Sequence, residues 1–300
     1  MICRDHFDDC SLWGVTIFLL ILILIPLSVF IGFAASAIGF TAWPLIVPVL
    51  FVFFGFDLYL TLFISLLVDC GNALVMVLKS YPQGLVDVKF GLMMAAYVLI
   101  WIAIGIGLGA AFIPQHQEMF RGAAGFLIII FGVLFIFRGY RLKRRISAGT
   151  HDPGAVLHFP KTHRQGLGIC RSRLIYPAAA AMGLQTGLIG IGGGMGHAVI
   201  LMVCLSYPTM MATGTAMLIT FCATLCAAAG IFLQIPGGTF DNTFLFLLIP
   251  LMAAMSMLGT RLGARIAHSL TDDKVNYFIG AIVVAAGVLA VWQKFLLQHV

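Results

Sequence analysis

A glycine-rich run inside a long apolar stretch constrains the fold of this chain more than any other feature. The apolar stretch extends from Leu174 to Leu205, and its centre, Gly190–Gly194, has four glycines in five positions. Each glycine destabilises a helix interior by about 1 kcal/mol relative to alanine. The run therefore predicts two short helices that meet at a break. Such non-helical backbone is tolerated at membrane depth only where protein buries it or water lines it.

A break of this kind predicts a cavity that suits an anion. The amide groups at the start of the second short helix carry a positive partial charge and point into the cavity. We expect the cavity to be lined by the glycines of the run and by nearby polar side chains, namely Gly190, Gly192, Gly193, Gly194, Gln185, Thr186 and His197. The alternative is that the glycines only let two helices pack closely, as small residues do in membranes.

The composition indicates an all-α polytopic membrane protein. Of 300 residues, 61% are hydrophobic and only 9% are charged, whereas a soluble domain carries about 25% charged residues. The apolar runs are Leu12–Phe33, Ile38–Phe54, Tyr59–Leu78, Phe90–Ile113, Gly122–Phe137, Leu174–Ile189, Met195–Leu205, Met210–Leu233, Phe244–Ala267 and Val275–Leu297, and most of them approach the roughly 20 residues that a membrane crossing requires. We expect these runs to lie in the lipid bilayer as helices.

The basic residues indicate membrane topology rather than nucleic-acid binding. The net charge is +6, but nine of the seventeen basic residues fall between Arg138 and Arg173, in a single hydrophilic segment. An excess of Lys and Arg marks a cytoplasmic loop of a membrane protein. We therefore expect this segment to be cytoplasmic, and we expect no nucleic-acid partner.

The two halves of the chain repeat. A shift of about 151 residues carries Gly39 onto Gly190, and a shift of about 154 residues carries Gly105 onto Gly259. Small loop insertions account for the difference between the shifts. The repeat divides the chain into a first membrane half (1–137), a basic connecting loop (138–173) and a second membrane half (174–300). We expect about four transmembrane helices and one broken element in each half.

The broken element of the first half uses proline in place of glycine. Pro44 and Pro48 follow Gly39, and proline breaks a helix because it lacks a backbone donor. Ser36 and Thr41 are the polar side chains of this segment that we expect to line the same cavity. Duplicated membrane chains with broken helices at equivalent positions are a recurring plan of secondary transporters, whose substrate sites lie near the midplane.

The broken element also decides how the two halves are oriented. If it crosses the membrane once, Arg261, Arg265 and Lys274 face outward. If its two arms form a hairpin that returns to the same side, these charges face the cytoplasm. The hairpin obeys the positive-inside tendency, so we expect the two repeats to be inverted relative to each other.

Two ionisable side chains lie deep in the apolar runs. Asp69 lies about halfway between Asp57 and Lys79, and a carboxylate at that depth usually faces a bundle interior or an aqueous path. It is a candidate proton-coupling group, with a structural hydrogen bond to Asn72 or to the backbone as the alternative. His197 is the second candidate because imidazole titrates near neutral pH. The alternative for His197 is a hydrogen bond within the helix packing.

The sequence shows no enzyme or metal-site pattern. It contains no nucleotide-binding P-loop, no H-E-x-x-H and no G-x-S-x-G. Cys222 and Cys226 share a helix face, but no His or carboxylate stands beside them to complete a metal site. We therefore expect no catalysis, no cofactor and no metal ligands.

With these features, the chain resembles the sulfite exporter family TauE/SafE, part of the broader toluene-sulfonate uptake permease group. The resemblance rests on Gly183–Val199, which is similar to the glycine-rich element of that family, and on Ala212–Ala216, Gly259–Arg265 and the two-half layout. Val199 stands where the family typically has a proline. The resemblance implies transport of sulfur-containing or other small organic anions across a bacterial inner membrane by a multi-pass protein.

The sequence therefore predicts a secondary transporter of small anions such as sulfite, sulfonates or related organic acids, driven by a proton or electrochemical gradient. The expected partners are a small anionic substrate and the lipid bilayer, and the sequence leaves the oligomeric state open. One alternative is a permease for another solute, including a metal ion. Another is a membrane assembly or scaffold protein in which the glycines only pack helices.

Overall fold

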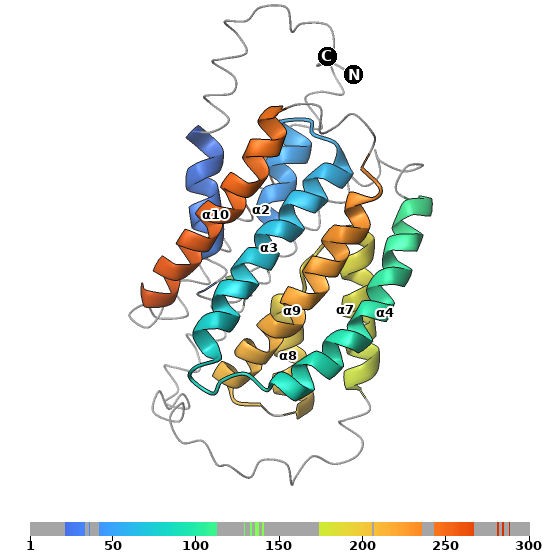
Figure 1. The fold of residues 1–300 in the computed structure, drawn as a ribbon, viewed down its shortest axis with the longest axis vertical. Coiled ribbons are helices and arrows are strands. Elements are labelled where there is room, and N and C mark those ends of the chain that lie inside the picture. The colour runs from blue at the N-terminus through green and yellow to red at the C-terminus, as the bar shows by residue number, and fades with distance from the viewer. Residues whose placement is uncertain are drawn as a thin grey trace, which may run out of the picture.

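A computed structural model describes residues 22–33, 36, 42–112, 174–205, 207–235 and 243–266, together with the isolated positions 129, 133, 136, 137, 140, 281, 284 and 288. Throughout these ranges the regular structure is helical and contains no strand (Figure 1). This arrangement confirms the all-α fold expected from the composition.

The helices follow the predicted apolar runs closely. They are a helix over Leu22–Phe33, α2 (Trp43–Val47), the π-helix η1 (Pro48–Phe53), α3 (Leu58–Ser80), α4 (Val88–Phe112), α7 (Ile175–Ile189), α8 (Gly194–Leu205), α9 (Thr209–Phe232) and α10 (Thr243–Ile266). Among the described residues, three segments are long and apolar enough to cross a membrane, namely Leu58–Ser80, Val88–Phe112 and Met210–Phe232. The predicted runs Gly122–Phe137 and Val275–Leu297 lie outside the continuous described ranges.

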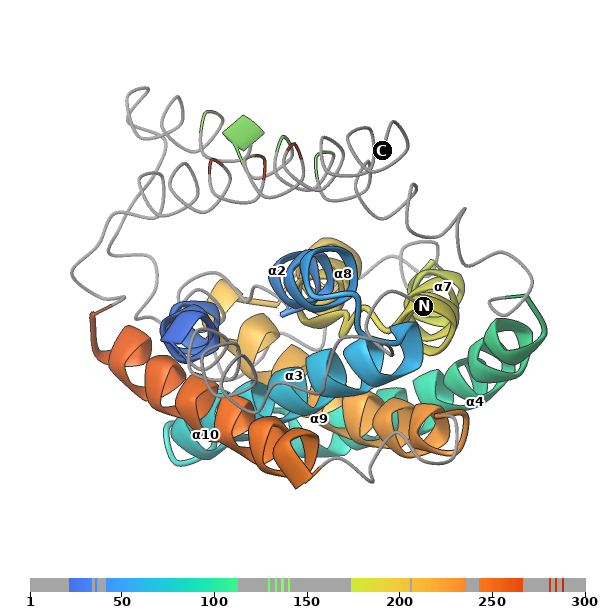
Figure 2. The ribbon, with the colours of Figure 1, turned by 90° about the horizontal axis from the view of Figure 1, so that it is seen from above.

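The helices lie in two layers (Figure 2). One layer contains α10, α3, α9 and α4, and the other contains the helix Leu22–Phe33, α2 stacked on α8, and α7. At the centre, α3 packs against α9, while α4 packs against both α7 and α9, and α10 packs against α3. The broken elements therefore lie against the two central membrane-spanning helices.

Each broken element has a first arm, which is the helix Leu22–Phe33 in the first element and α7 in the second. Glycines bring each first arm into backbone contact with a neighbouring helix. On the α4–α7 pair, a Cβ added at Gly187 would collide with the carbonyl of Ile102, and one added at Gly183 would lie 2.7 Å from the carbonyl oxygen of Val98. On the opposite side, a Cβ at Gly32 would collide with the backbone of α10 at Ser256. The packing interpretation of the glycines is therefore correct for Gly183 and Gly187.

The second broken element is a hairpin. Because Gly183 lies beside Val98 and Gly187 lies beside Ile102, α7 runs in the same direction as α4. Tyr207, which follows α8, donates its hydroxyl to Oδ2 of Asp87, the residue before α4, at 3.0 Å. The second arm thus returns to the end of the bundle at which α4 and α7 begin.

The first broken element approaches from the opposite end. Its second arm, α2 and η1, begins near the middle of α3 and leads to the start of α3. Figure 1 shows α2 above α8, and Figure 2 shows the two superposed, so they lie end to end with their starts towards the middle. After each second arm the chain makes the same backbone bond. Phe56 N–H donates to the carbonyl of Leu50 at 2.9 Å, and Tyr207 N–H donates to that of Leu201 at 3.3 Å.

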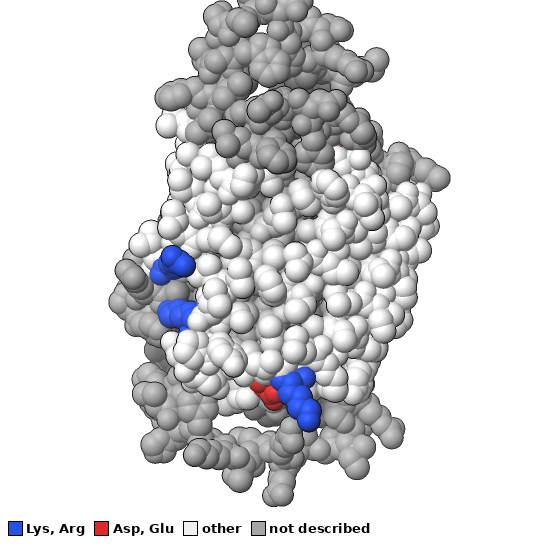
Figure 3. Space-filling model, viewed as in Figure 1, with Lys and Arg blue, Asp and Glu red and all other residues white. Residues whose placement is uncertain are grey.

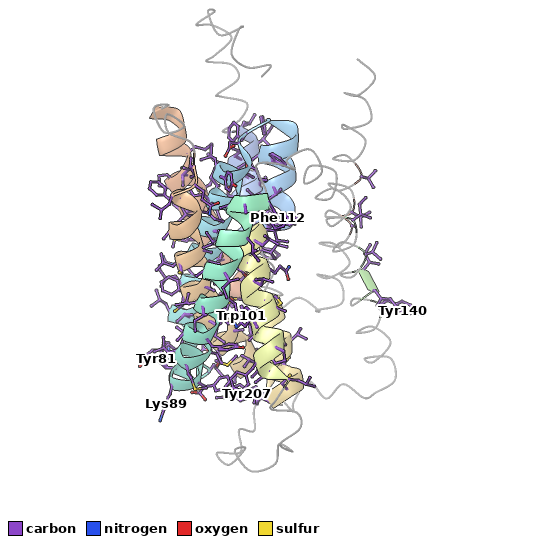
Figure 4. The ribbon with its side chains drawn as sticks, turned by 90° about the vertical axis from the view of Figure 1, so that its right-hand side faces the viewer. Tyr81, Lys89, Trp101, Phe112, Tyr140 and Tyr207 are labelled. Atoms are coloured by element: carbon purple, nitrogen blue, oxygen red, sulfur yellow. The ribbon has the colours of Figure 1, made fainter. Side chains whose placement is uncertain are left out.

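The outer surface suits a bilayer. The face in Figure 3 is almost free of charge, with Lys, Arg, Asp and Glu only towards its lower and left margins. Tyr81, Lys89 and Tyr207 lie at one end of the molecule, and Phe112 lies at the other end of α4 (Figure 4). A nearly uncharged surface with charged and aromatic side chains towards one end is expected of a membrane protein.

The charged helix ends agree with the hairpin alternative. In Figure 1, α3 and α10 run in the same direction, so Lys79 near the end of α3 and Arg261 near the end of α10 lie towards the same end. The connecting loop 138–173 and the basic position Lys274 lie outside the continuous described ranges. The cytoplasmic location of the connecting loop therefore stays a prediction. The division of the chain into two halves stays a prediction as well.

Candidate functional site

The start of α2, in the second arm of the first broken element, is capped by a side chain from a different helix. The backbone N–H of Ala42, directly before α2, donates to Oδ1 of Asp69 at 2.6 Å. The first amide groups of a helix have no partner within the helix, and a carboxylate is a favoured group at that position. The predicted alternative for Asp69, a hydrogen bond to the backbone, is therefore present, while Asn72 has other partners.

The second half-helix starts at an open glycine turn. Gly190 ends α7 in the left-handed conformation, with φ +70°, and its N–H donates to the carbonyl of Thr186 at 3.0 Å. Gly193 also has φ +70°, which residues with a Cβ rarely adopt. Helix α8 begins at Gly194, and the N–H of His197 closes its first turn on the carbonyl of Gly193 at 2.9 Å. The break predicted at Gly190–Gly194 is thus confirmed.

The glycine turn lies next to two predicted ionisable side chains, Asp69 and His197, and next to one hydroxyl that was not predicted. A Cβ added at Gly192 would collide with Oδ2 of Asp69. One added at Gly193 would lie 3.0 Å from Cε1 of His197, and one at Gly194 would lie 3.5 Å from Oγ1 of Thr220. Asp69, His197 and Thr220 therefore surround the turn from α3, α8 and α9.

Several polar atoms at this level are buried and have no hydrogen-bond partner among the described residues. They are Oδ2 of Asp69, both ring nitrogens of His197, Oγ1 of Thr220, Oγ of Ser65, Nε1 of Trp43 and Nδ2 of Asn72. None of these side chains is more than 4% exposed. Folded proteins leave few buried polar atoms unpaired, so this concentration indicates a place for water or for a polar solute.

The positive character of the site comes from the backbone. Within the described ranges, Asp69 is the one buried acidic side chain and no Lys or Arg is buried. The free amide groups at the start of α8, a helix of 12 residues, supply a positive partial charge. The side chains of His197 and Thr220 add hydrogen-bonding capacity beside those amides. Chemically, the arrangement can hold a small group with oxygen acceptors.

A separate polar cluster fixes the neighbouring helices. Oδ1 of Asn72 accepts hydrogen bonds from the hydroxyls of Ser256 and Thr260, each at 2.8 Å. The Thr260 hydroxyl also lies 3.1 Å from the carbonyl oxygen of Gly32. This cluster joins α3, α10 and the helix Leu22–Phe33, so it has a structural role beside the site.

Other predicted lining residues lie in different settings. The Thr186 hydroxyl contacts the carbonyl oxygens of Met182 at 2.9 Å and Ile191 at 2.7 Å, which ties the glycine turn to α7. Ser36 donates to the carbonyl of Phe33 at 2.8 Å and lies against Gly263 of α10. Gln185 is half-buried on α7. Thr41 lies outside the described residues.

The sequence-based list missed the amide of Ala42 and the hydroxyl of Thr220. A signal for Thr220 existed, because the shift of about 151 residues that relates the two broken elements carries Asp69 onto Thr220. No comparable signal existed for Ala42, since only the fold brings its amide to Asp69. In the part of the chain that the structure describes, no three His, Cys, Asp or Glu side chains gather to hold a metal ion.

A bundle with several membrane-spanning helices, and with polar groups buried at a helix break, has the architecture of a membrane permease. The family model described as sulfite exporter TauE/SafE matches residues 24–290, and the chain belongs to this family. The protein is thus a transmembrane permease or exporter, as the resemblance implied. No curated protein and no solved structure matches the chain.

Proposed function

We propose that this protein is a secondary transporter that moves small anions, of the class of sulfite, sulfonates or related organic acids, across a bacterial inner membrane. The observation that carries the proposal is the glycine turn Gly192–Gly194 at the start of α8, with the buried and unpartnered side chains of His197 and Thr220 beside it. Helix starts of this kind bind anions through backbone amides.

The chemistry of the turn favours an oxyanion over a metal ion. A metal cation needs several carboxylate, thiolate or imidazole ligands, and the turn has one carboxylate with one oxygen already bonded to Ala42. Amide and hydroxyl donors instead match the oxygens of a sulfonate or sulfite group. The absence of a Cβ at Gly192 and Gly193 allows such a group to approach the backbone closely.

The two hairpins support alternating access between inverted repeats. They enter from opposite ends of the bundle and place their second arms end to end near the middle. Corresponding turns, at Phe56 and Tyr207, make corresponding backbone bonds. In transporters of this plan the substrate site lies between the repeats, and each side opens in turn. An electrochemical gradient drives net movement in this proposal.

Uptake into proteoliposomes tests the proposal. Purified protein should accumulate a labelled anion from a panel of sulfite, methanesulfonate, sulfate and acetate in a saturable way, and protein-free liposomes should not. Labelled Zn²⁺ in the same vesicles tests the alternative of metal transport. Saturable Zn²⁺ uptake without uptake of any anion would overturn the proposal.

Inverted repeats also make a topological prediction. Reporter fusions at Gly149 and Ser269 should both report the cytoplasm, because the charged segments next to them belong to one side in the hairpin arrangement. Fusions that report opposite sides of the membrane would contradict inverted repeats and leave a broken element that crosses once.

A further inference from the structure

The carboxylate of Asp69 lies between the two broken elements. Its Oδ1 holds the amide of Ala42 at the start of the first half-helix. Its Oδ2 faces Gly192, where a Cβ would lie 3.0 Å from Cγ of Asp69. The side chain is 4% exposed and Oδ2 has no partner among the described residues. Asp69 thus brings one negative charge to the edge of the turn proposed to hold the substrate.

Among the described residues, no side chain near Asp69 carries an opposite charge. Neither α2 nor η1 has an ionisable residue, and at this level α10 presents Ser256, Met257 and Thr260. Cys70 and Cys222 are nearby on α3 and α9, and thiols are uncharged near neutral pH. His197 lies across the glycine turn on α8. In the described part of the chain, the positive partial charge at the site therefore comes from backbone amides.

A second negative charge at Gly192–Gly194 would lie in contact with the first. Two like charges that share a buried site disfavour each other strongly, and one of them becomes neutral by taking up a proton. The oxygen available for that proton is Oδ2, because Oδ1 already accepts from Ala42. Once protonated, Oδ2 becomes a hydrogen-bond donor aimed past Gly192, where an acceptor oxygen of the substrate would lie.

We infer that Asp69 is the proton carrier of this transporter and that its substrate is a monoanion: the anion binds at Gly192–Gly194 with one proton on Oδ2 of Asp69, and the pair moves as a neutral unit. This inference rests on the proposed function and adds the charge of the substrate and the proton stoichiometry. On release the proton leaves Oδ2 for water, and Asp69 is again a carboxylate that accepts from Ala42 through Oδ1.

Methanesulfonate is the appropriate probe because it stays a monoanion at every usable pH, so any dependence of binding on pH belongs to the protein. Sulfate is the matched dianion of similar size. The wild-type protein should bind methanesulfonate at least about tenfold more tightly near pH 6 than near pH 8 and should prefer it to sulfate at least about tenfold. Uptake should carry about one proton into the vesicle for each methanesulfonate, measured with a pH-sensitive dye inside the vesicles.

The matched variants are Asp69→Asn and His197→Gln. Asp69→Asn keeps an acceptor for Ala42 and an uncharged donor, so it should bind and exchange methanesulfonate with affinities near pH 6 and pH 8 that agree within about twofold, and without proton movement. His197→Gln changes a residue of the substrate site and should bind more weakly, but each methanesulfonate that it moves should still be accompanied by about one proton. Thermal unfolding of each purified variant checks that it is folded. If Asp69→Asn does not fold, the wild-type stoichiometry and His197→Gln still decide.

The outcomes separate the two proposals. The role of Asp69 would be overturned if Asp69→Asn still moved protons with methanesulfonate, if His197→Gln moved methanesulfonate without protons, or if wild-type methanesulfonate uptake moved none. A wild-type preference for sulfate would overturn the monoanion. Failure of the wild-type protein to bind or transport any anion of the panel would instead remove the proposed function itself.

Discussion

The two broken elements meet near the middle of the bundle, and the helix starts of their second arms face different side chains. At the first start, the amide of Ala42 is bonded to Asp69 of α3. At the second, the turn at Gly192–Gly194 faces Thr220 of α9, whose hydroxyl has no partner among the described residues. The difference shows how one architecture can supply an anion of its own at one helix start and leave the other start open for a solute.

The difference depends on side-chain chemistry rather than on helix geometry. Both second arms begin at mid-bundle, and both end in a turn with the same backbone bond, at Phe56 and at Tyr207. The central helix opposite each start contributes a polar residue, Asp69 on α3 and Thr220 on α9. A carboxylate in place of the hydroxyl at position 220 is therefore the most direct test of this difference between the two helix starts.

The largest effect is expected for Thr220→Asp. A carboxylate at this position would lie against Gly194 and bind the free amides of α8, just as Asp69 binds the amide of Ala42 at the first helix start. It would therefore compete with the substrate for the amides of α8. We expect a loss of about 100-fold or more in anion affinity, measured by binding of labelled substrate to purified protein. Thr220→Val, which has nearly the same shape without charge, should lose less than about tenfold. Equal losses in the two variants would show that charge at position 220 is irrelevant.

The next effect is expected for Gly193→Ala. The added methyl group would require a strained positive φ and would lie 3.0 Å from His197 Cε1 and 3.4 Å from Thr186 Oγ1. We expect about tenfold weaker anion binding, together with a stability loss of about 1 kcal/mol. Gly55 has φ +67° with nothing within 4 Å of its added Cβ.

Gly55→Ala is therefore the control for backbone strain alone, and it should lower the free energy of unfolding by a similar amount while anion affinity stays unchanged. Gly183→Ala reports helix packing, because its Cβ would lie 2.7 Å from the carbonyl oxygen of Val98. Equal anion affinity for the Gly193 and Gly55 variants would restrict the glycine turn to a structural role.

A smaller effect is expected for His197→Gln. Both ring nitrogens are buried without a partner in the described part of the chain, so the imidazole is available to bond the substrate, and glutamine keeps one donor and one acceptor. We expect affinity to fall about 3- to 10-fold. The ratio of wild-type to variant affinity should stay constant between about pH 6 and pH 8 if Asp69 carries the proton. A ratio that changes with pH would assign the titrating charge to His197.

The smallest effect is expected for Tyr207→Phe. The hydroxyl bond to Asp87 ties the end of α8 to the start of α4, whereas the corresponding Phe56 has no hydroxyl. Its loss should cost about 1 kcal/mol of unfolding free energy and leave anion affinity within about twofold. Asp87→Asn keeps one oxygen as acceptor for the Phe90 N–H at 3.1 Å and places an NH2 donor next to the Tyr207 hydroxyl oxygen, so it should be milder. A large loss of affinity in Tyr207→Phe would extend the site to this end of the molecule.

Much of this architecture could be predicted from local sequence. Glycine cost and apolar run length predicted the break at Gly190–Gly194 and most helix boundaries within a few residues. A lone carboxylate in an apolar run marked Asp69. The partners of these groups could not be predicted, because Ala42 lies 27 residues from Asp69 along the chain and Ser256 lies 184 residues from Asn72. Such pairs depend on which helix faces meet, and apolar periodicity does not specify that.

The glycine contacts between the first arms and their neighbours limit how this protein can move. Backbone touches backbone where Gly187 meets Ile102, and again where Gly32 meets Ser256. At such separations there is no layer of side chains to shear, so neither pair can slip by a fraction of a turn without the backbones colliding. The first arm of each hairpin must therefore travel with its partner as one body, α7 with α4 and Leu22–Phe33 with α10. Opening of the protein to either side of the membrane must therefore occur at the contacts between these helix pairs and the second arms.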